Sequence, residues 1–100
     1  MEPTPRKIVE YVEGGISPFR RWISGLRDGK GRGVIRNRIN RVMAGNFGDC
    51  NPIGDGAHEL VVDFGHGYRV YFGQDGDMVV LLGGGDKSTQ QSDIARLKHR

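Results

Sequence analysis

The chain has 100 residues and a mass of 11.1 kDa, of which 36% are hydrophobic and 27% are charged. A chain of this size forms one small domain that buries roughly 60–65% of the surface exposed by its unfolded state. The single cysteine, Cys50, excludes an internal disulfide or a thiolate metal cluster, and no apolar run is long enough to cross a membrane. We therefore expect a single cytosolic domain over residues 1–100, with no cofactor and no metal.

The net charge of +3 is unevenly distributed along the chain. Residues 1–45 carry ten Lys or Arg against four Asp or Glu, a net of +6, whereas residues 46–100 carry five against eight, a net of −3. A basic surface attracts phosphate backbones or an acidic protein partner, although small proteins also place arginine on helices simply to solvate them. The arginines of the second predicted helix that could contact RNA are Arg36, Arg38 and Arg41.

The first half of the sequence predicts one strand and two helices. Residues 7–12 form the strand, and Ser17-Pro18 begins a helix with a capping hydroxyl and a proline at the first helical position. The apolar stripe of this helix, at positions i, i+3, i+4 and i+7, comprises Phe19, Trp22, Ile23 and Leu26. The second helix covers about residues 32–44, and its predicted buried face comprises Ile35, Ile39, Val42 and Met43.

The second half predicts a loop, three strands and a helix. Residues 46–57 are rich in glycine, asparagine, aspartate and proline, which is typical of a loop. The predicted strands are 58–64, 68–74 and 77–83, the last two joined by a tight turn at Asp75-Gly76. A final helix begins at about Thr89, with Ser88 and Gln91 in a capping-box pattern.

This order, β-α-α-β-β-β-α, predicts an α+β fold with a small, mostly antiparallel sheet that a helix pair covers on one face. Strict alternation in residues 68–72 directs Tyr68, Val70 and Phe72 to the core, and Arg69 and Tyr71 to the opposite face. The glycines at 83–85 lack the GxxxxGK[ST] spacing of a phosphate loop. They predict a sharp turn from strand to helix.

Two segments resemble a known family when they occur together at this spacing: GYRVYF at 67–72 and LLGGGDKSTQQSDIARLK at 81–98. They are similar to the "addiction module killer" proteins, toxins of bacterial type II toxin–antitoxin pairs in the RelE/ParE superfamily and close to HigB. The resemblance covers roughly residues 16–98 and implies a RelE-like fold. It also implies a toxin that cuts messenger RNA on the ribosome and is neutralised by a cognate antitoxin, typically a helix-turn-helix protein that carries the pair to operator DNA.

Such cleavage needs a base for the 2′-hydroxyl proton, cations at the phosphate and an acid for the leaving oxygen, but no metal. The resemblance implies that Arg69 contacts the scissile phosphate, where a guanidinium can bind two oxygens at once. Lys87 would be a second cation, while Tyr71 could stack a base or donate a proton and His66 could act as an acid or base. His58 and the near-terminal His99 are weaker candidates.

Each candidate also has a purely structural interpretation. Arg69 could form a salt bridge with Asp63 on the neighbouring strand, and Tyr71 could pack under the last helix. Lys87 could be an ordinary exposed loop lysine, and His66 a solvated residue of a turn.

The chain departs from RelE-type nucleases in one respect, because the strand at 58–64 has no lysine or arginine. Cations on that strand would stabilise the charge at the phosphate. Their absence favours an alternative within the same fold, a ParE-like toxin that inhibits DNA gyrase by protein contact. A non-toxic nucleic-acid-binding module is a third hypothesis.

Overall fold

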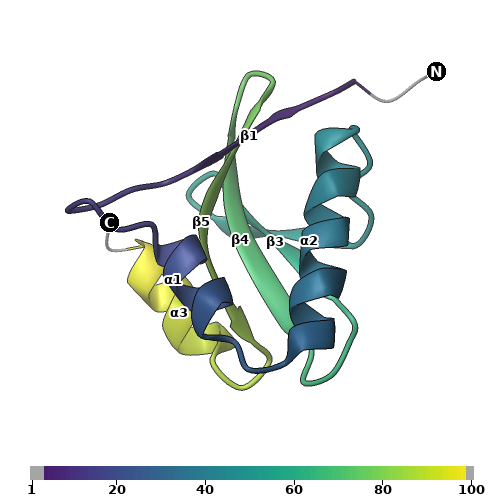
Figure 1. Ribbon diagram of the computed structural model, residues 1–100. Coiled ribbons are helices and arrows are strands. Elements are labelled where there is room, and N and C mark those ends of the chain that lie inside the picture. Colours follow the sequence, from purple (N-terminus) through teal and green to yellow (C-terminus); the bar gives the residue numbers. More distant parts are fainter. Residues whose placement is uncertain (1–3, 99–100) are drawn as a thin grey trace.

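The computed structural model describes residues 4–98, which form a five-stranded mixed sheet and three helices (Figure 1). In chain order the elements are β1 (Lys7–Glu10), α1 (Pro18–Gly25), α2 (Gly29–Met43), β2 (Cys50–Gly54), β3 (Ala57–Val62), β4 (Tyr68–Asp75), β5 (Met78–Asp86) and α3 (Gln90–Lys98). None of the described helices has the length and apolar character needed to cross a membrane. His99 lies outside the described residues.

The sheet has the order β1-β5-β4-β3-β2. β1 pairs with β5 in parallel, and the other three pairings are antiparallel, so the predicted α+β class and mostly antiparallel sheet are confirmed. β5 carries one extra residue between the partners of Tyr71 and Phe72, since Tyr71 pairs with Gly83 and Phe72 with Leu81. Because of this bulge, Gly83 faces the same side as Tyr71 and Leu81 the same side as Phe72, so these two residues of β5 lie on opposite faces although they are two positions apart.

The prediction of a loop over residues 46–57 is wrong, because Cys50–Gly54 forms β2 and pairs with β3. β2 lies at the edge of the sheet, where a proline such as Pro52 is tolerated because its missing amide donor can face outward. The pairing is also irregular between Pro52 and Gly54. A composition typical of a loop is therefore compatible with an edge strand.

The helices lie on both faces of the sheet. A Cβ atom built on Gly84 would meet the ring of Trp22 in α1, whereas one built on the next residue, Gly85, would meet Asp93 in α3. Because successive strand residues point to opposite faces, α1 and α3 lie on opposite faces of β5. α2 packs with α1 on the first face, so the predicted helix pair is confirmed and α3 is an additional cover.

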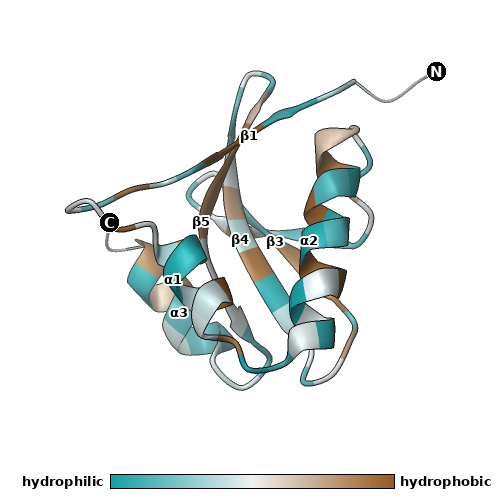
Figure 2. Ribbon diagram, viewed as in Figure 1, coloured by the Kyte–Doolittle hydropathy of each residue, from teal (hydrophilic) through white to brown (hydrophobic). Residues whose placement is uncertain are grey.

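The hydrophobic core lies between the sheet and the α1–α2 pair, where brown segments of α2 and β4 face each other in Figure 2. The buried residues of this cluster are Phe19, Ile23, Ile35, Ile39, Val42, Leu60, Val62, Tyr68, Val70, Phe72, Val79 and Leu81. Trp22 and Leu26 pack at its margin. The predicted Met43 is the exception among the apolar residues of the second helix, since it is 45% exposed at the last position of α2.

Local capping explains where the helices begin. Ser17 accepts a hydrogen bond from the Arg20 amide at 3.1 Å and caps α1 as predicted. α2 starts three residues earlier than predicted, because Asp28 accepts a hydrogen bond from the Gly31 amide at 2.9 Å. The other oxygen of Asp28 accepts the Tyr68 hydroxyl at 2.7 Å, which attaches the start of α2 to β4.

The prediction that the glycines at 83–85 form the turn into the last helix is wrong, because they lie within β5 and the turn follows at residues 87–89. The cap of α3 also differs from the predicted one. Ser88 does not cap the helix, and α3 begins at Gln90. Instead the Asp86 carboxylate accepts hydrogen bonds from the amides of Ser88 and Thr89, at 2.8 and 3.2 Å. The last residue of β5 therefore organises the turn that leads from the sheet into α3.

Candidate functional site

The alternation predicted for the GYRVYF segment is confirmed. Tyr68, Val70 and Phe72 are buried in the core, and Arg69 and Tyr71 project from the opposite face of β4, toward α3. The sheet therefore separates an apolar face from a polar one. A candidate site is therefore expected on the polar face of the sheet and at the adjoining end of the sheet.

Arg69 is held close to the sheet by neighbouring groups. Its Nε lies 3.8 Å from a carboxylate oxygen of Glu59, and its Nη1 donates 3.3 Å hydrogen bonds to the Gly67 and Tyr68 carbonyls. Only 13% of its side chain is exposed. The alternative prediction of a salt bridge between Arg69 and Asp63 is wrong. Asp63 lies beyond the end of β3 and is exposed, whereas Glu59 lies within β3.

Glu59 is a buried carboxylate that the sequence interpretation missed. It is 6% exposed, and the Gln90 amide nitrogen donates to both of its oxygens, at 3.0 and 2.8 Å. A buried carboxylate is costly unless it is hydrogen-bonded and paired, and here Gln90 and Arg69 supply both. Gln90 is the first residue of α3, so this contact joins α3 to β3 across the polar face.

Tyr71 is buried under α3. It is 1% exposed, and its hydroxyl oxygen has no hydrogen-bond partner of good geometry among the described residues. Burial raises the pKa of this phenol, and the nearby carboxylates Asp93 and Glu59 raise it further. The hydroxyl therefore stays protonated at neutral pH. It can serve only as a proton donor, and only to a group that reaches beneath α3.

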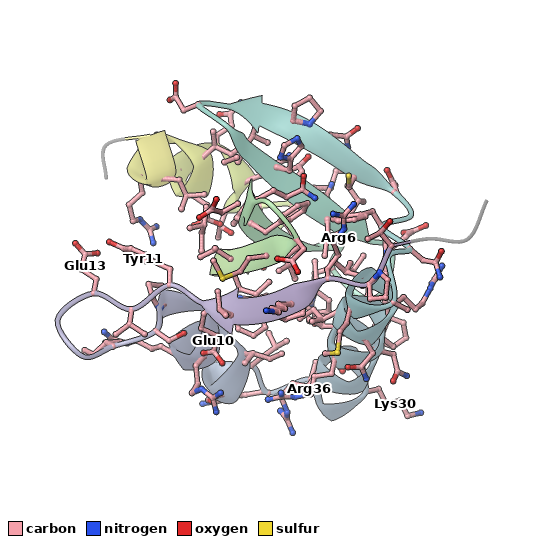
Figure 3. All side chains as sticks on the ribbon, turned by 90° about the horizontal axis from the view of Figure 1, so that it is seen from above. Arg6, Glu10, Tyr11, Glu13, Lys30 and Arg36 are labelled. Carbon is pink, nitrogen blue, oxygen red and sulfur yellow. The ribbon has the colours of Figure 1, made fainter. Side chains whose placement is uncertain are left out.

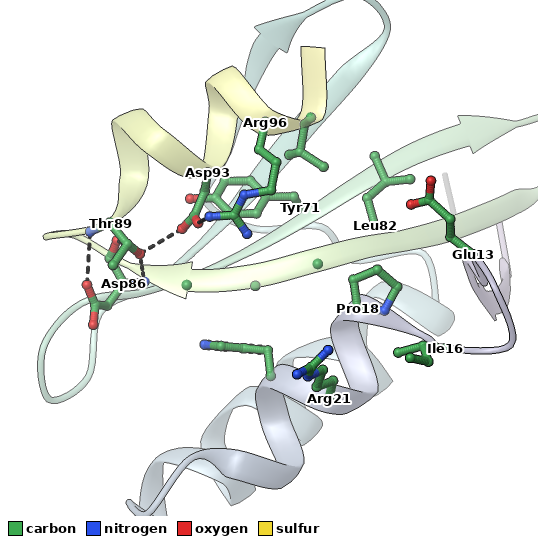
Figure 4. A pocket seen from close by; sticks show the side chains of 15 residues that line it. Glu13, Ile16, Pro18, Arg21, Tyr71, Leu82, Asp86, Thr89, Asp93 and Arg96 are labelled. Carbon is green, nitrogen blue, oxygen red and sulfur yellow. Dashed lines mark hydrogen bonds and ion pairs between the residues drawn. The ribbon is translucent and has the colours of Figure 1, made fainter. Parts of the chain in front are cut away.

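Asp93 links α3 to the glycine segment of β5 (Figure 4). It is 8% exposed, accepts the Thr89 hydroxyl at 2.7 Å and forms an ion pair with Arg96 at 3.2 Å. A Cβ atom on Gly85 would lie 2.0 Å from an Asp93 oxygen. Glycine is therefore required at this position so that α3 can approach the strand closely.

Three of the four predicted catalytic residues meet at one end of the sheet, around Gly67. A Cβ atom there would lie 3.6 Å from Cβ of Lys87 and 3.7 Å from Nη1 of Arg69, and His66 directly precedes Gly67. Lys87 and His66 are both exposed. Hydrogen bonds from Ser88 lower the pKa of the adjacent Asp86 carboxyl, and His66 contributes to the same shift. Tyr71 is set back from this cluster by two residues along β4.

The three arginines of α2 predicted to contact RNA, Arg36, Arg38 and Arg41, do not act together. Arg38 donates to the carbonyls of Phe47, Val61 and Asp49 at 2.7–3.3 Å, so its guanidinium fastens the segment that follows α2 to β3. Burial lowers the pKa of Arg38, and the adjacent Arg41 adds to this effect. Arg36 and Arg41 are exposed, and Figure 3 shows Arg36 on the side of the molecule that also carries Glu10. α2 lies on the apolar face of the sheet, so none of these arginines lies on the polar face that carries Arg69.

His58 also belongs to the apolar face. Its ring stacks on Phe72 with centroids 5.4 Å apart, and His58 and Phe72 are directly paired across β3 and β4. Residues 4–98 contain no group of three or more His, Cys, Asp or Glu side chains that could hold a metal ion.

Beside the polar face is a cavity of about 630 Å³, which lies between α1 and α3 along the glycine segment of β5 (Figure 4). α1 contributes Pro18, Arg21 and Trp22 to it. α3 contributes Asp93, Arg96 and Leu97. Neither Arg69 nor Lys87 lines this cavity, so it is distinct from the cluster around Gly67.

Comparison with known proteins identifies one relative. The chain is 48% identical over 81 residues to a protein of Haemophilus influenzae (strain ATCC 51907 / DSM 11121 / KW20 / Rd), which is described only as an uncharacterized protein. The match spans 80% of this chain and 82% of that protein, so the two belong to one family. No protein-family model and no solved structure matches the chain.

Proposed function

We propose that this chain is the toxin of a type II toxin–antitoxin pair, with a RelE-like topology, and that it cleaves messenger RNA on the ribosome. The observation that carries this proposal is the meeting of Arg69, Lys87 and His66 around Gly67. Arg69 and Lys87 come from the two segments, GYRVYF and GGDKSTQ, that resemble addiction module killer proteins, and His66 directly precedes the first of them. Lys87 is thus brought to the same end of the sheet as Arg69 and His66, which lie 18 and 21 positions before it in the chain.

The proposed reaction uses the 2′-hydroxyl of the RNA as the nucleophile. Its oxygen attacks the adjacent phosphorus, the bond from phosphorus to the 5′-oxygen breaks, and the products are a 2′,3′-cyclic phosphate and a free 5′-hydroxyl. Arg69 and Lys87 would stabilise the charge that develops on the phosphate oxygens. The 2′-hydroxyl proton would pass to a water molecule, and His66, which is exposed and adjacent, would in its protonated form donate a proton to the leaving 5′-oxygen.

Two features limit how RNA could reach Arg69. The guanidinium is mostly covered, with 13% of the side chain exposed, and Glu59 competes with a phosphate for its charge. The neighbouring β3 carries no lysine or arginine, and Val61 is the residue paired with Arg69. Phosphate binding would therefore require the guanidinium to turn outward from Glu59, toward Lys87.

These same features support a second candidate function, a ParE-like toxin that binds DNA gyrase. Contact inhibition needs no free guanidinium at a phosphate, so a covered Arg69 with a structural ion pair is compatible with it. Both candidates require a cognate antitoxin. In the HigB-like case the antitoxin would be a helix-turn-helix protein that also binds operator DNA.

The deciding experiment is induced expression of the chain in a bacterial host, with mapping of transcript ends and measurement of DNA breaks. Growth arrest with new transcript ends would support RNA cleavage, and co-expression of the neighbouring gene should restore growth. Arrest with DNA breaks and intact transcripts would support the gyrase candidate. Normal growth at high levels of folded protein would refute both.

The Arg69→Ala variant tests the central residue. Loss of one positioned cation typically lowers the rate of cleavage about 10²–10³-fold. The structure also predicts a stability cost, because Glu59 would keep its Gln90 contact but lose its only ion pair among the described residues. We therefore expect a lower melting temperature together with lost cleavage.

The Arg69→Ala, Glu59→Gln double variant separates the two effects, since it removes the buried charge as well as its partner. Cleavage should remain absent although the melting temperature recovers. Cleavage that returns with the stability would show that Arg69 is structural. Lys7→Ala serves as the control, because Lys7 is an exposed cation paired with Met78, at the opposite end of β5 from the Gly67 cluster, and should leave both measurements unchanged.

A further inference from the structure

β5 has an outer edge that β1 covers over only half of its length. The two strands pair from Met78 to Leu81, and the last backbone hydrogen bond joins the Tyr11 amide to the Leu81 carbonyl at 2.9 Å. The chain then leaves the sheet, turns through the Glu13–Ile16 bridge and enters α1. Among residues 4–98, no strand pairs with the Leu82–Asp86 segment on this side.

An open strand edge presents unpaired amide and carbonyl groups, which can pair with another extended chain. Natural proteins usually protect such an edge with charged side chains, a proline or a covering loop. Here the edge residues Gly83, Gly84 and Gly85 have no side chains at all. Along this edge Leu82, Gly84 and Asp86 are partly exposed, whereas Gly83 and Gly85 are buried. The edge segment is five residues long, about 16 Å of strand.

The 630 Å³ cavity between α1 and α3 contains this edge (Figure 4). Its volume lies within the range of about 300–1,000 Å³ that is typical of ligand sites. Apolar side chains from Ile16, Pro18 and Leu97 line it beside the glycines. Since residues of an added strand point alternately to the two faces of the sheet, successive side chains would contact the α1 wall and the α3 wall.

The charges of the cavity favour an acidic side chain on the α1 wall. Asp93 forms an ion pair with Arg96, and Asp86 accepts hydrogen bonds from Ser88 and Thr89 but keeps its negative charge. These groups lie at the α3 side of the cavity, away from the α1 wall. Glu13 lies at the rim of the cavity, near Leu82 in Figure 4. Arg21 is an exposed cation that forms no ion pair within the described part of the chain.

We propose that the Leu82–Asp86 edge is a docking site for an extended segment of a partner protein, which adds to the sheet as a strand and places a carboxylate against Arg21. Main-chain hydrogen bonds would supply the affinity, and the alternating walls would select acidic residues toward α1 and aliphatic residues toward α3. This docking site does not depend on the proposed toxin activity, because it uses a different surface from the Gly67 cluster.

A selection of random displayed peptides on the immobilised full-length chain tests this proposal. We expect enrichment of peptides that alternate acidic and aliphatic residues. On binding, such a peptide should protect the backbone amides of Leu82–Asp86 from hydrogen exchange. A selection that enriches no peptide, or peptides that protect other amides, would overturn the proposal.

Two variants locate the bound peptide. Arg21→Glu should weaken binding about tenfold or more, because it replaces attraction with repulsion, while Arg41→Glu on α2 should have no effect. Gly83→Val should also weaken binding, because the added side chain would fill part of the cavity that the bound segment occupies. The variant should still fold, since a Cβ at Gly83 meets nothing within 4 Å. Binding that withstands both changes would refute the docking site. Protection of the same amides that rises with protein concentration alone would show that a second copy, and not a partner protein, occupies the edge.

Discussion

Three consecutive glycines in β5 have different surroundings, and these differences predict that the same substitution is tolerated at one of them and destabilising at the other two. A Cβ at Gly84 would lie 2.0 Å from the Trp22 ring, and one at Gly85 would lie 2.0 Å from Asp93, whereas one at Gly83 would meet nothing within 4 Å. Forcing extra atoms into a packed region typically costs about 1–3 kcal/mol. Gly84→Ala should therefore lower the free energy of unfolding by that amount, measured by urea denaturation.

The other two glycines provide the comparison. Gly83→Ala should leave stability unchanged or slightly raised, because it reduces the freedom of the unfolded chain without a clash. Gly85→Ala should be destabilising as well, because it would displace Asp93 from its bond to Thr89. Equal stabilities for the three variants would contradict the close approach of α1 and α3 to opposite faces of β5.

At the scale of the secondary-structure elements, Asp28 joins two parts of the fold. It caps α2 through the Gly31 amide and accepts the Tyr68 hydroxyl from β4. These hydrogen bonds, the Gly31 amide foremost, lower the pKa of Asp28 in the folded protein. A carboxyl with a lowered folded pKa stabilises the protein at pH values above its unfolded pKa, about 3.9, and this contribution is lost as the pH falls through the folded pKa.

Asp28→Asn should therefore lower the melting temperature more at neutral pH than at about pH 3, where the wild-type carboxyl approaches protonation. Thermal unfolding of both proteins across this range measures the difference. Asp63→Asn controls for the removal of one negative charge, because Asp63 is exposed beyond the end of β3. A constant difference between wild type and Asp28→Asn at all pH values would show that the charge of Asp28 does not contribute to the cap.

At the scale of the whole molecule, local sequence patterns are sufficient to predict which residues form the core, but insufficient to predict the contacts made on the polar face. Alternation in the GYRVYF segment correctly assigned Tyr68 to the core and Arg69 to the other face, because burial on one side of a strand requires that pattern. β2 was missed because an edge strand does not need a continuous apolar or donor-rich sequence.

The Glu59–Gln90 contact could not be read from spacing, since it joins residues 31 positions apart through the packing of α3. The sequence does contain one indication of where Glu59 lies, namely its position in the alternation along β3. Glu59 lies on the same face of β3 as Val61, the partner of Arg69, and is directly paired with Tyr71. That signal places a carboxylate beside a cation, but it does not show that a helix will cover both.

The division of the molecule into two faces predicts that α3 opens before the rest of the protein unfolds. The buried apolar cluster contains no residue of α3, which is joined to the sheet mainly by the Glu59–Gln90 contact and by Asp93. Segments with few buried apolar contacts open locally at a lower free energy than the core. In native-state hydrogen exchange, the α3 amides should therefore exchange faster than those of α2 and β4.

Gln90→Ala should widen this difference, because it removes the contact between α3 and β3 and leaves the α1–α2 core intact. Its effect should be confined to the α3 amides, with exchange in α2 and β4 unchanged. Uniform acceleration throughout the chain, or identical opening free energies for α3 and α2 in the wild type, would show that the protein unfolds as one unit. Because Arg69 lies beneath the same contacts, the opening measured here is also the event that would expose its guanidinium to a phosphate.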